Sequence, residues 1–150
     1  MLSYELALFD FVRGNERSME KLSRSLEDYL EAIVMLGGTT EQSVRPSDIA
    51  RKMGVSKTSA GKALTSLRNH GFVVQPYYGE ATLTEQGFAY ATSILKRHRY
   101  LTIFLERAIG LSHETAEEEA CLMEHAISDE TFEKWVAYIV RIGILDDEEA

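Results

Sequence analysis

The chain has 150 residues, of which 45% are hydrophobic and 27% are charged, a composition that excludes fibrous and intrinsically disordered proteins. No apolar run approaches the roughly 20 residues that span a bilayer, and no basic segment precedes the apolar N-terminal residues, which argues against a secretory signal. The single cysteine, Cys121, cannot form an internal disulfide. We therefore expect a soluble, cytoplasmic protein that does not associate with membranes.

The net charge of −8 is distributed unevenly along the chain. Residues 41–80 carry six basic and three acidic side chains, whereas residues 101–150 carry three basic and thirteen acidic side chains. Such an asymmetry indicates that the two halves have different roles. A nucleic-acid contact is therefore expected in the first half, despite the acidic chain.

Apolar residues recur at helical spacing over Ser25–Leu36, and Gly37 and Gly38 end this first predicted helix. Residues 1–20 are less regular, and we interpret them as an N-terminal extension. Two short helices follow, one over Pro46–Met53 and one that begins with Ser56 as its N-cap and ends near residues 69–71. Two helices joined by a short turn that contains glycine form a helix-turn-helix.

Beyond residue 71 the pattern changes from helical to extended. Residues 72–75 and 81–84 predict two strands, and the turn-forming residues 76–80 between them complete a hairpin, which we interpret as a wing. Three helices are then expected, and each has a serine or threonine at its N-cap: they run from Thr84 to about Ile109, over Ser112–Ile127, and from Ser128 to about Ile142. The sequence predicts a mainly α fold that begins with a winged helix-turn-helix.

The second helix of a helix-turn-helix enters the major groove, where its N-terminal residues reach base edges and flanking cations meet phosphates. Here that helix opens with short hydroxyl side chains and a lysine, and Arg68 near its end is a further candidate for a backbone contact. The candidate DNA-binding residues are Arg45, Arg51, Ser56, Lys57, Thr58, Ser59, Lys62 and Tyr78. The alternative is that Ser56 only caps the helix and the lysines only solvate it, but the wing and the local positive charge favour DNA binding.

Three potential metal ligands stand close together in the second half. Cys121, Glu124 and His125 occupy positions i, i+3 and i+4 of a predicted helix, beside its apolar stripe. A thiolate, a carboxylate and an imidazole suit a first-row transition metal better than calcium or magnesium. The alternative is a buried cysteine next to an ordinary surface pair.

Three other polar residues are ambiguous when taken alone. Asp28 stands three residues after Ser25, which favours a capping box, with Glu31 as a solvated neighbour. His98 lies in the basic run Lys96–Arg99, where a phosphate contact and a solvated position are equally reasonable interpretations.

Four segments, residues 26–33, 45–50, 96–99 and 119–130, strongly resemble the diphtheria toxin repressor and manganese transport regulator family. The similarity covers about Leu22–Ile142. It is most specific in residues 119–130, where the cysteine, the glutamate-histidine pair and a serine-aspartate-glutamate sequence follow the dimerisation-domain motif without interruption. The resemblance implies a metal-dependent repressor that is not an enzyme and has no catalytic residues. The ligands that it implies are Asp28, Glu31, His98, Cys121, Glu124 and His125.

The resemblance leaves two metals as candidates. Cys121 is typical of the iron-type branch, whereas Asp28 and Glu31 resemble the manganese-type branch, so Mn²⁺ or Fe²⁺ is expected, and Co²⁺ or Zn²⁺ is possible in vitro. Thr102 stands where the iron-type branch has an acidic residue of its auxiliary site. The chain also stops near Ala150, so that we expect no C-terminal domain similar to an SH3 barrel.

The family also implies a homodimer on an inverted repeat of double-stranded operator DNA and control of metal-uptake genes. We expect an N-terminal extension over residues 1–20, a winged helix-turn-helix DNA-binding domain over 21–90, and a helical dimerisation and metal-binding domain over 91–150. One rival is a winged-helix regulator that answers to a small molecule or to oxidation of Cys121. A metalloenzyme is disfavoured because no second cluster offers a nucleophile and a base.

Overall fold

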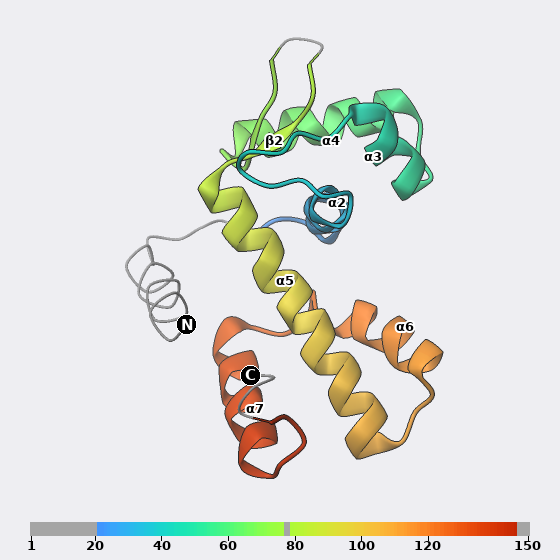
Figure 1. The fold of residues 1–150 in the computed structure, drawn as a ribbon, viewed down its shortest axis with the longest axis vertical. Coiled ribbons are helices and arrows are strands. Elements are labelled where there is room, and N and C mark those ends of the chain that lie inside the picture. The colour runs from blue at the N-terminus through green and yellow to red at the C-terminus, as the bar shows by residue number, and fades with distance from the viewer. Residues whose placement is uncertain (1–20, 77–78, 147–150) are drawn as a thin grey trace. The chain divides into compact units, whose positions relative to one another are not determined.

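The computed structural model describes residues 21–76 and 79–146. The predicted N-terminal extension, residues 1–20, and Tyr78 of the wing therefore lie outside the described residues. The chain divides into two compact units between Ala89 and Tyr90 (Figure 1). The expected mainly helical fold is confirmed.

The first unit contains a three-helix bundle and a β-hairpin. Its elements are α2 (Arg24–Met35), α3 (Pro46–Met53), α4 (Lys57–Asn69), β1 (Val73–Val74), β2 (Thr82–Leu83) and the start of α5 (Glu85–Phe104). The two strands are antiparallel, with Val73 opposite Leu83 and Val74 opposite Thr82. An isolated antiparallel bridge between Val44 and Ala81 joins the segment before α3 to the hairpin, next to β2. The predicted strands exist, but they are two residues shorter than the sequence pattern suggested.

Local capping interactions determine where the helices of the first unit begin. Ser23, and not the expected Ser25, caps α2, and its Oγ accepts a hydrogen bond from the Leu26 amide at 3.3 Å. The bounds of α3 agree with the prediction, and Gly54 ends this helix with a φ of 66° that favours glycine. Ser56 caps α4 as expected, since its Oγ accepts from the Ser59 amide at 3.1 Å.

The core of the first unit lies where α2, α3 and α4 meet and under the hairpin. Its fully buried side chains are Leu30, Ile33, Ile49, Leu64, Leu67, Val73 and Leu83. The first turn of α5 packs tightly against the start of the hairpin, because a Cβ atom on Gly87 would lie only 2.0 Å from the Phe72 carbonyl oxygen. Glycine is therefore required at position 87 by this close approach.

The second unit consists of the rest of α5, a π-helical turn η1 (Leu105–Ile109), α6 (His113–Met123) and α7 (Asp129–Arg141). Ser112 and Ser128 cap α6 and α7 as expected. The prediction that α6 extends to Ile127 is wrong, because the helix ends at Met123. The physical reason is a long-range contact: Arg97 Nη1 donates to the carbonyl oxygens of Glu124 at 3.2 Å and of Ile127 at 2.7 Å.

Two adjoining clusters form the core of the second unit. One contains Leu101, Leu105, Ala116 and Ala120, and the other contains Tyr100, Ile139 and Leu145. Phe104 and Trp135 pack against both clusters, with their rings in an edge-to-face contact at 4.9 Å between centroids. Among the described helices, none is long and apolar enough to cross a membrane.

Candidate functional site

Asp28 and Glu31 lie one helical turn apart on α2 in the first unit. Because Ser23 is the N-cap of this helix, the capping-box interpretation of Asp28 is wrong. The position expected for the acidic partner of the cap, three residues after Ser23, is occupied by Leu26. The Asp28 carboxylate therefore has no helix-capping role that would account for its position.

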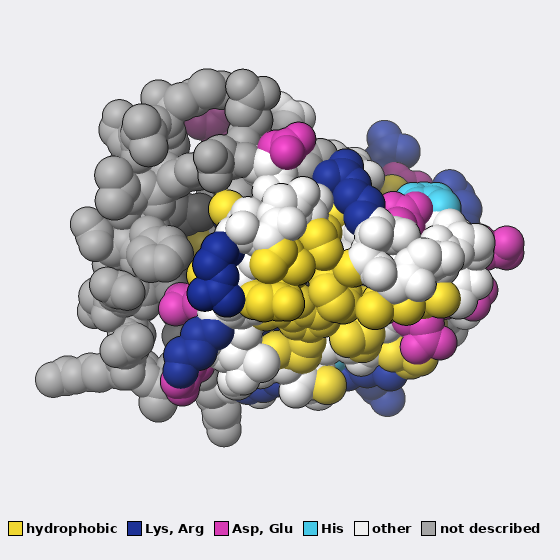
Figure 2. Space-filling model, turned by 90° about the horizontal axis from the view of Figure 1, so that it is seen from below, with side chains coloured by type: hydrophobic (Ala, Val, Ile, Leu, Met, Phe, Trp, Pro, Cys, Tyr) yellow, Lys and Arg dark blue, Asp and Glu magenta, His cyan; other side chains and the backbone are white. Residues whose placement is uncertain are grey.

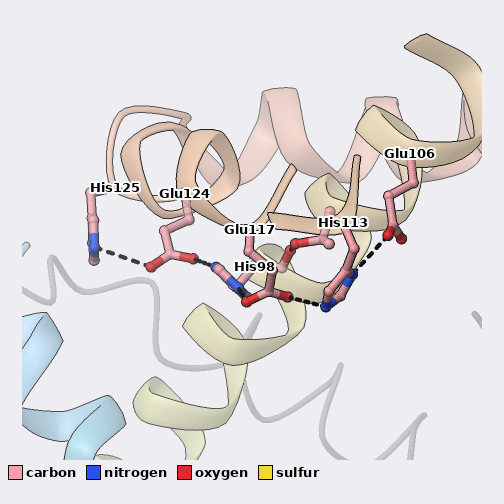
Figure 3. Close-up of polar contacts among 7 residues, drawn as sticks. His98, Glu106, His113, Glu117, Glu124 and His125 are labelled. Atoms are coloured by element: carbon pink, nitrogen blue, oxygen red, sulfur yellow. Dashed lines mark hydrogen bonds and ion pairs between the residues drawn. The ribbon is translucent and has the colours of Figure 1, made fainter. Parts of the chain in front are cut away.

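In the second unit, the imidazole of His98 on α5 lies between two carboxylates of α6 and its C-cap (Figure 3). His98 Nδ1 is 2.7 Å from Glu124 Oε2, and His98 Nε2 is 3.0 Å from Glu117 Oε2. The hydrogen bond to Glu124 is the main cause that raises the pKa of His98 to about 9; burial opposes it, and Glu117 adds to it. The interpretation of His98 as a merely solvated side chain is therefore wrong, because both ring nitrogens contact carboxylates.

Glu124 is the most deeply buried ionisable side chain of this group, with 1% of its side chain exposed. Its second carboxylate oxygen, Oε1, lies 3.2 Å from Nε2 of His125, whose side chain is 5% exposed. A buried carboxylate needs a compensating positive charge. The raised pKa of His98 favours a protonated, positively charged imidazole beside this carboxylate.

This donor set fits a first-row transition-metal ion. Glu124 offers a carboxylate, and His98 and His125 offer imidazoles that lie against the same carboxylate. Such oxygen and nitrogen donors suit manganese, iron, cobalt and zinc. A divalent cation bound to the Glu124 carboxylate would compensate the same buried charge as the proton on His98.

Cys121 lies on α6, half-buried, one helical turn before Glu124. Although α6 ends at Met123, Glu124 keeps helical backbone angles, with φ −58° and ψ −33°. The expected i, i+3 spacing of Cys121 and Glu124 is therefore preserved in the structure. His125 follows in the turn that connects α6 with α7.

Glu117 was missed by the sequence analysis, which counted it only as one of many acidic residues. The available signal was spacing, because Glu117, Cys121 and Glu124 stand at i, i+4 and i+7 on one side of a helix. Glu117 also extends the cluster outward, since its Oε1 is 4.0 Å from His113 Nε2, and His113 Nδ1 is 2.7 Å from Glu106 Oε1 (Figure 3).

Arg97, next to His98 on α5, holds the turn that carries Glu124 and His125. Its guanidinium bonds to two carbonyl oxygens of this turn, forms an ion pair with Asp129 and lies over the Phe132 ring at 5.5 Å. These contacts assign roles to the serine-aspartate-glutamate motif: Ser128 caps α7 and Asp129 holds Arg97. The motif thus positions the metal-ligating candidates.

The described candidate DNA-binding residues lie in the first unit, at the N-cap of α3 and on α3, and at the N-cap of α4 and along α4. Lys57, Thr58, Ser59 and Lys62 are exposed on α4. Ser56 is the N-cap of α4, so its hydroxyl has the helix-capping role that the alternative interpretation gave it. Tyr78 lies outside the described residues.

The two candidate arginines are exposed and paired with acids. Arg51 Nη1 is 3.3 Å from Asp48 Oδ1, and Arg45 Nε is 3.4 Å from Glu80 Oε1, with 80% and 72% of the arginine side chains exposed. The hydrogen bond from Ser43 and the ion pair with Arg45 lower the pKa of Glu80. Exposed pairs of this kind contribute little to stability. Both guanidinium groups are therefore available to exchange these partners for phosphates.

Comparisons with known proteins agree with both units. Residues 21–81 match the N-terminal DNA-binding domain of iron-dependent repressors, and residues 84–142 match the metal-binding and dimerisation domain of the same family. A helix-turn-helix transcriptional regulator of Methanocaldococcus jannaschii, itself uncharacterised, is 37% identical over 114 residues, which cover 75% of this chain and 90% of the relative. The transcriptional regulator MntR of Salmonella typhimurium is 31% identical over 135 residues, or 89% and 85% of the two chains.

Among solved structures, the manganese regulator SloR is 27% identical, with a TM-score of 0.64 over 76% of this chain. The chain spans about half, 53%, of the length of that structure. The chain belongs to the iron-dependent repressor family, which consists of metal-dependent transcriptional repressors with a DNA-binding domain and a metal-binding dimerisation domain. The family resemblance of the sequence is thereby confirmed.

Proposed function

We propose that this protein binds operator DNA as a homodimer when Mn²⁺ or Fe²⁺ is bound, that it acts in the cytoplasm, and that it represses metal-uptake genes. The observation that carries the proposal is the buried Glu124 carboxylate with an imidazole against each oxygen, within a domain that matches a metal-binding family model. A bound cation would stabilise a carboxylate that is buried in this way. The exposed basic residues of α4 supply the DNA-binding side of the proposal.

We further propose that the unit through Ala89 contacts DNA and that the unit from Tyr90 dimerises. The proposed metal ligands come from both units: Asp28, Glu31, His98, Cys121, Glu124 and His125. Without an ion, the carboxylates of such a set repel one another. A cation removes that repulsion and favours the conformation in which all the ligands converge.

The metal response follows from coupling between two binding equilibria. If the metal-bound conformation is the one that binds two operator half-sites roughly 34 Å apart on an inverted repeat, metal and DNA each favour it. Coupling free energies of about 1–3 kcal/mol correspond to a roughly 5- to 150-fold gain in operator affinity, and DNA increases metal affinity by the same factor. The distance between the two DNA-binding units of the dimer then sets the spacing of the operator half-sites.

An apolar surface of the second unit is the proposed dimer interface. Trp135, Tyr138 and Ile142 share one side of α7, because they stand at i, i+3 and i+7, and Trp135 contacts Phe104 of α5. We call Phe104, Trp135, Tyr138 and Ile142 the apolar face. Tyr138 and Ile142 are 47% and 46% exposed in the single chain, and Figure 2 shows hydrophobic side chains gathered over one face. Exposed apolar patches of this kind mark association surfaces.

A DNA-binding titration tests the proposed function. Duplexes selected from a random library by the metal-loaded protein are titrated with protein in Mn²⁺, Fe²⁺, Co²⁺, Zn²⁺ or chelator, and affinity is read by fluorescence anisotropy. Mn²⁺ or Fe²⁺ is expected to raise affinity roughly 5- to 150-fold. Equal affinity with metal and with chelator would overturn the proposal. Binding that depends on peroxide, and loses this dependence in Cys121→Ser, would favour the thiol-oxidation alternative.

Cys121 is expected to supply a thiolate to the bound ion. The Co²⁺-loaded protein should then show a thiolate-to-cobalt charge-transfer band in the near ultraviolet, and Cys121→Ser should lack the band. Because thiolates are soft ligands, the substitution should also weaken Co²⁺ and Zn²⁺ binding more than Mn²⁺ binding. A spectrum that is identical in the two proteins would exclude Cys121 as a ligand.

A further inference from the structure

Gly61 lies in the interior of α4, on a side of this helix that the protein core does not use. The other described glycines each have a reason within the chain. Five of them, Gly37, Gly54, Gly71, Gly110 and Gly143, have positive φ angles between 66° and 91°. Gly38, Gly79 and Gly87 approach neighbouring atoms so closely that a Cβ would lie within 3.0 Å of them. Gly61 alone among the glycines of residues 21–76 and 79–146 has no positive φ and no atom within 4 Å of an added Cβ.

This glycine is unfavourable for the helix that contains it. Glycine in a helix interior loses more backbone entropy than alanine does, and no atom of residues 21–76 and 79–146 stands where the methyl group of an alanine would lie. The same helix has alanines at positions 60 and 63, where the side chain is buried against the core. Glycine, which is smaller than alanine, thus stands on the side of α4 that faces away from the core, where no contact with the described residues calls for a small side chain.

The surroundings of Gly61 indicate what approaches it. A groove of about 500 Å³ lies between this side of α4 and the hairpin. Its lining residues are Thr58, Gly61, Lys62, Thr65, Arg68, Gln75 and Pro76. The lining offers two cations and several hydrogen-bonding groups, but no acid. Such a surface suits a polyanion with polar edges, which is the chemistry of duplex DNA.

We propose that Gly61 is the point of closest approach between α4 and duplex DNA, and that its missing side chain lets the wall of the major groove enter the space beside Lys62 and Arg68. The inference rests on the proposed DNA-binding function and makes it more specific. A methyl group at this position would hold the DNA away from α4. The cations would then lose contact with it.

The test separates folding from binding by substituting Gly61→Ala in the full chain. Because alanine favours the helix, the melting temperature should rise by roughly 2–4 °C. Affinity for the selected duplex in Mn²⁺ should nevertheless fall at least about tenfold, since a close contact is lost. The matched control is Ser66→Ala on the same helix, which lies outside the groove and should leave DNA affinity unchanged.

Each outcome decides between the alternatives. If the wild type binds the selected duplex and Gly61→Ala binds it with the same affinity, this inference is overturned and the proposed function stands. A lower melting temperature in Gly61→Ala would reveal an internal role for the glycine and would also overturn it. If the wild-type chain selects no duplex in any metal, the proposed function fails, and this inference fails with it. A larger loss in Gly61→Val than in Gly61→Ala supports a steric contact.

Discussion

Replacing Glu124 with glutamine is expected to abolish the metal-induced gain in operator affinity. The substitution keeps the size of the side chain but removes the buried negative charge that faces His98 and His125 at 2.7 and 3.2 Å. A neutral amide neither attracts a divalent cation strongly nor needs one for compensation. Affinity in Mn²⁺ should then fall to the value measured in chelator, a loss of roughly 5- to 150-fold.

The matched control for this experiment is Glu118→Gln, an exposed acid on α6 that makes the same change in net charge. It should retain the metal response. Isothermal titration of Mn²⁺ into each protein adds a reading that does not depend on DNA. If Glu124→Gln responds to metal as the wild type does, the buried carboxylate is not part of the metal site.

Placing a charge on the apolar face is expected to convert the dimer into monomers. In Ile142→Glu, association would bury an unpaired carboxylate, and such a charge typically costs about 3–5 kcal/mol. The dimer dissociation constant should therefore rise at least about 100-fold. Because Ile142 is 46% exposed in the single chain, the substitution should leave folding intact. Analytical ultracentrifugation measures the mass, and circular dichroism measures the fold.

Met35→Glu provides the control for the dimer experiment. Met35 is 62% exposed at the end of α2, so the same kind of change is made in the other unit. This variant should remain dimeric. A dimeric Ile142→Glu protein would show that the chain associates through another surface, and Leu122, which is 54% exposed on α6, would become the next site to test.

Much of the helical framework was predictable because its signals are local. The bounds of α3 and the caps of α4, α6 and α7 depend on residues within one turn, such as Ser56, Ser112 and Ser128. The predicted end of α6 failed because a distant residue intervenes. Arg97 on α5 takes the carbonyls of Glu124 and Ile127, and α6 ends at Met123.

The candidate metal site divides in the same way. Chain spacing and donor type identified Glu124 and His125, because a carboxylate and an imidazole in adjacent positions are a local pattern. Glu117 was missed because its relation to His98 joins two helices, with a distance of 3.0 Å between Oε2 and Nε2. The raised pKa of His98 likewise depends on the acids that folding brings to it.

By itself, the sequence determined the helix-turn-helix, the charge of each half and the kinds of donor atom, since all three depend on residue type and short-range spacing. The tertiary structure decided which acids surround His98, where α6 ends, and which exposed hydrophobic residues share one surface. It also showed that no atom of the described residues lies within 4 Å of a Cβ atom added at Gly61. These features depend on contacts between residues far apart in the chain, and no periodicity in the sequence encodes them.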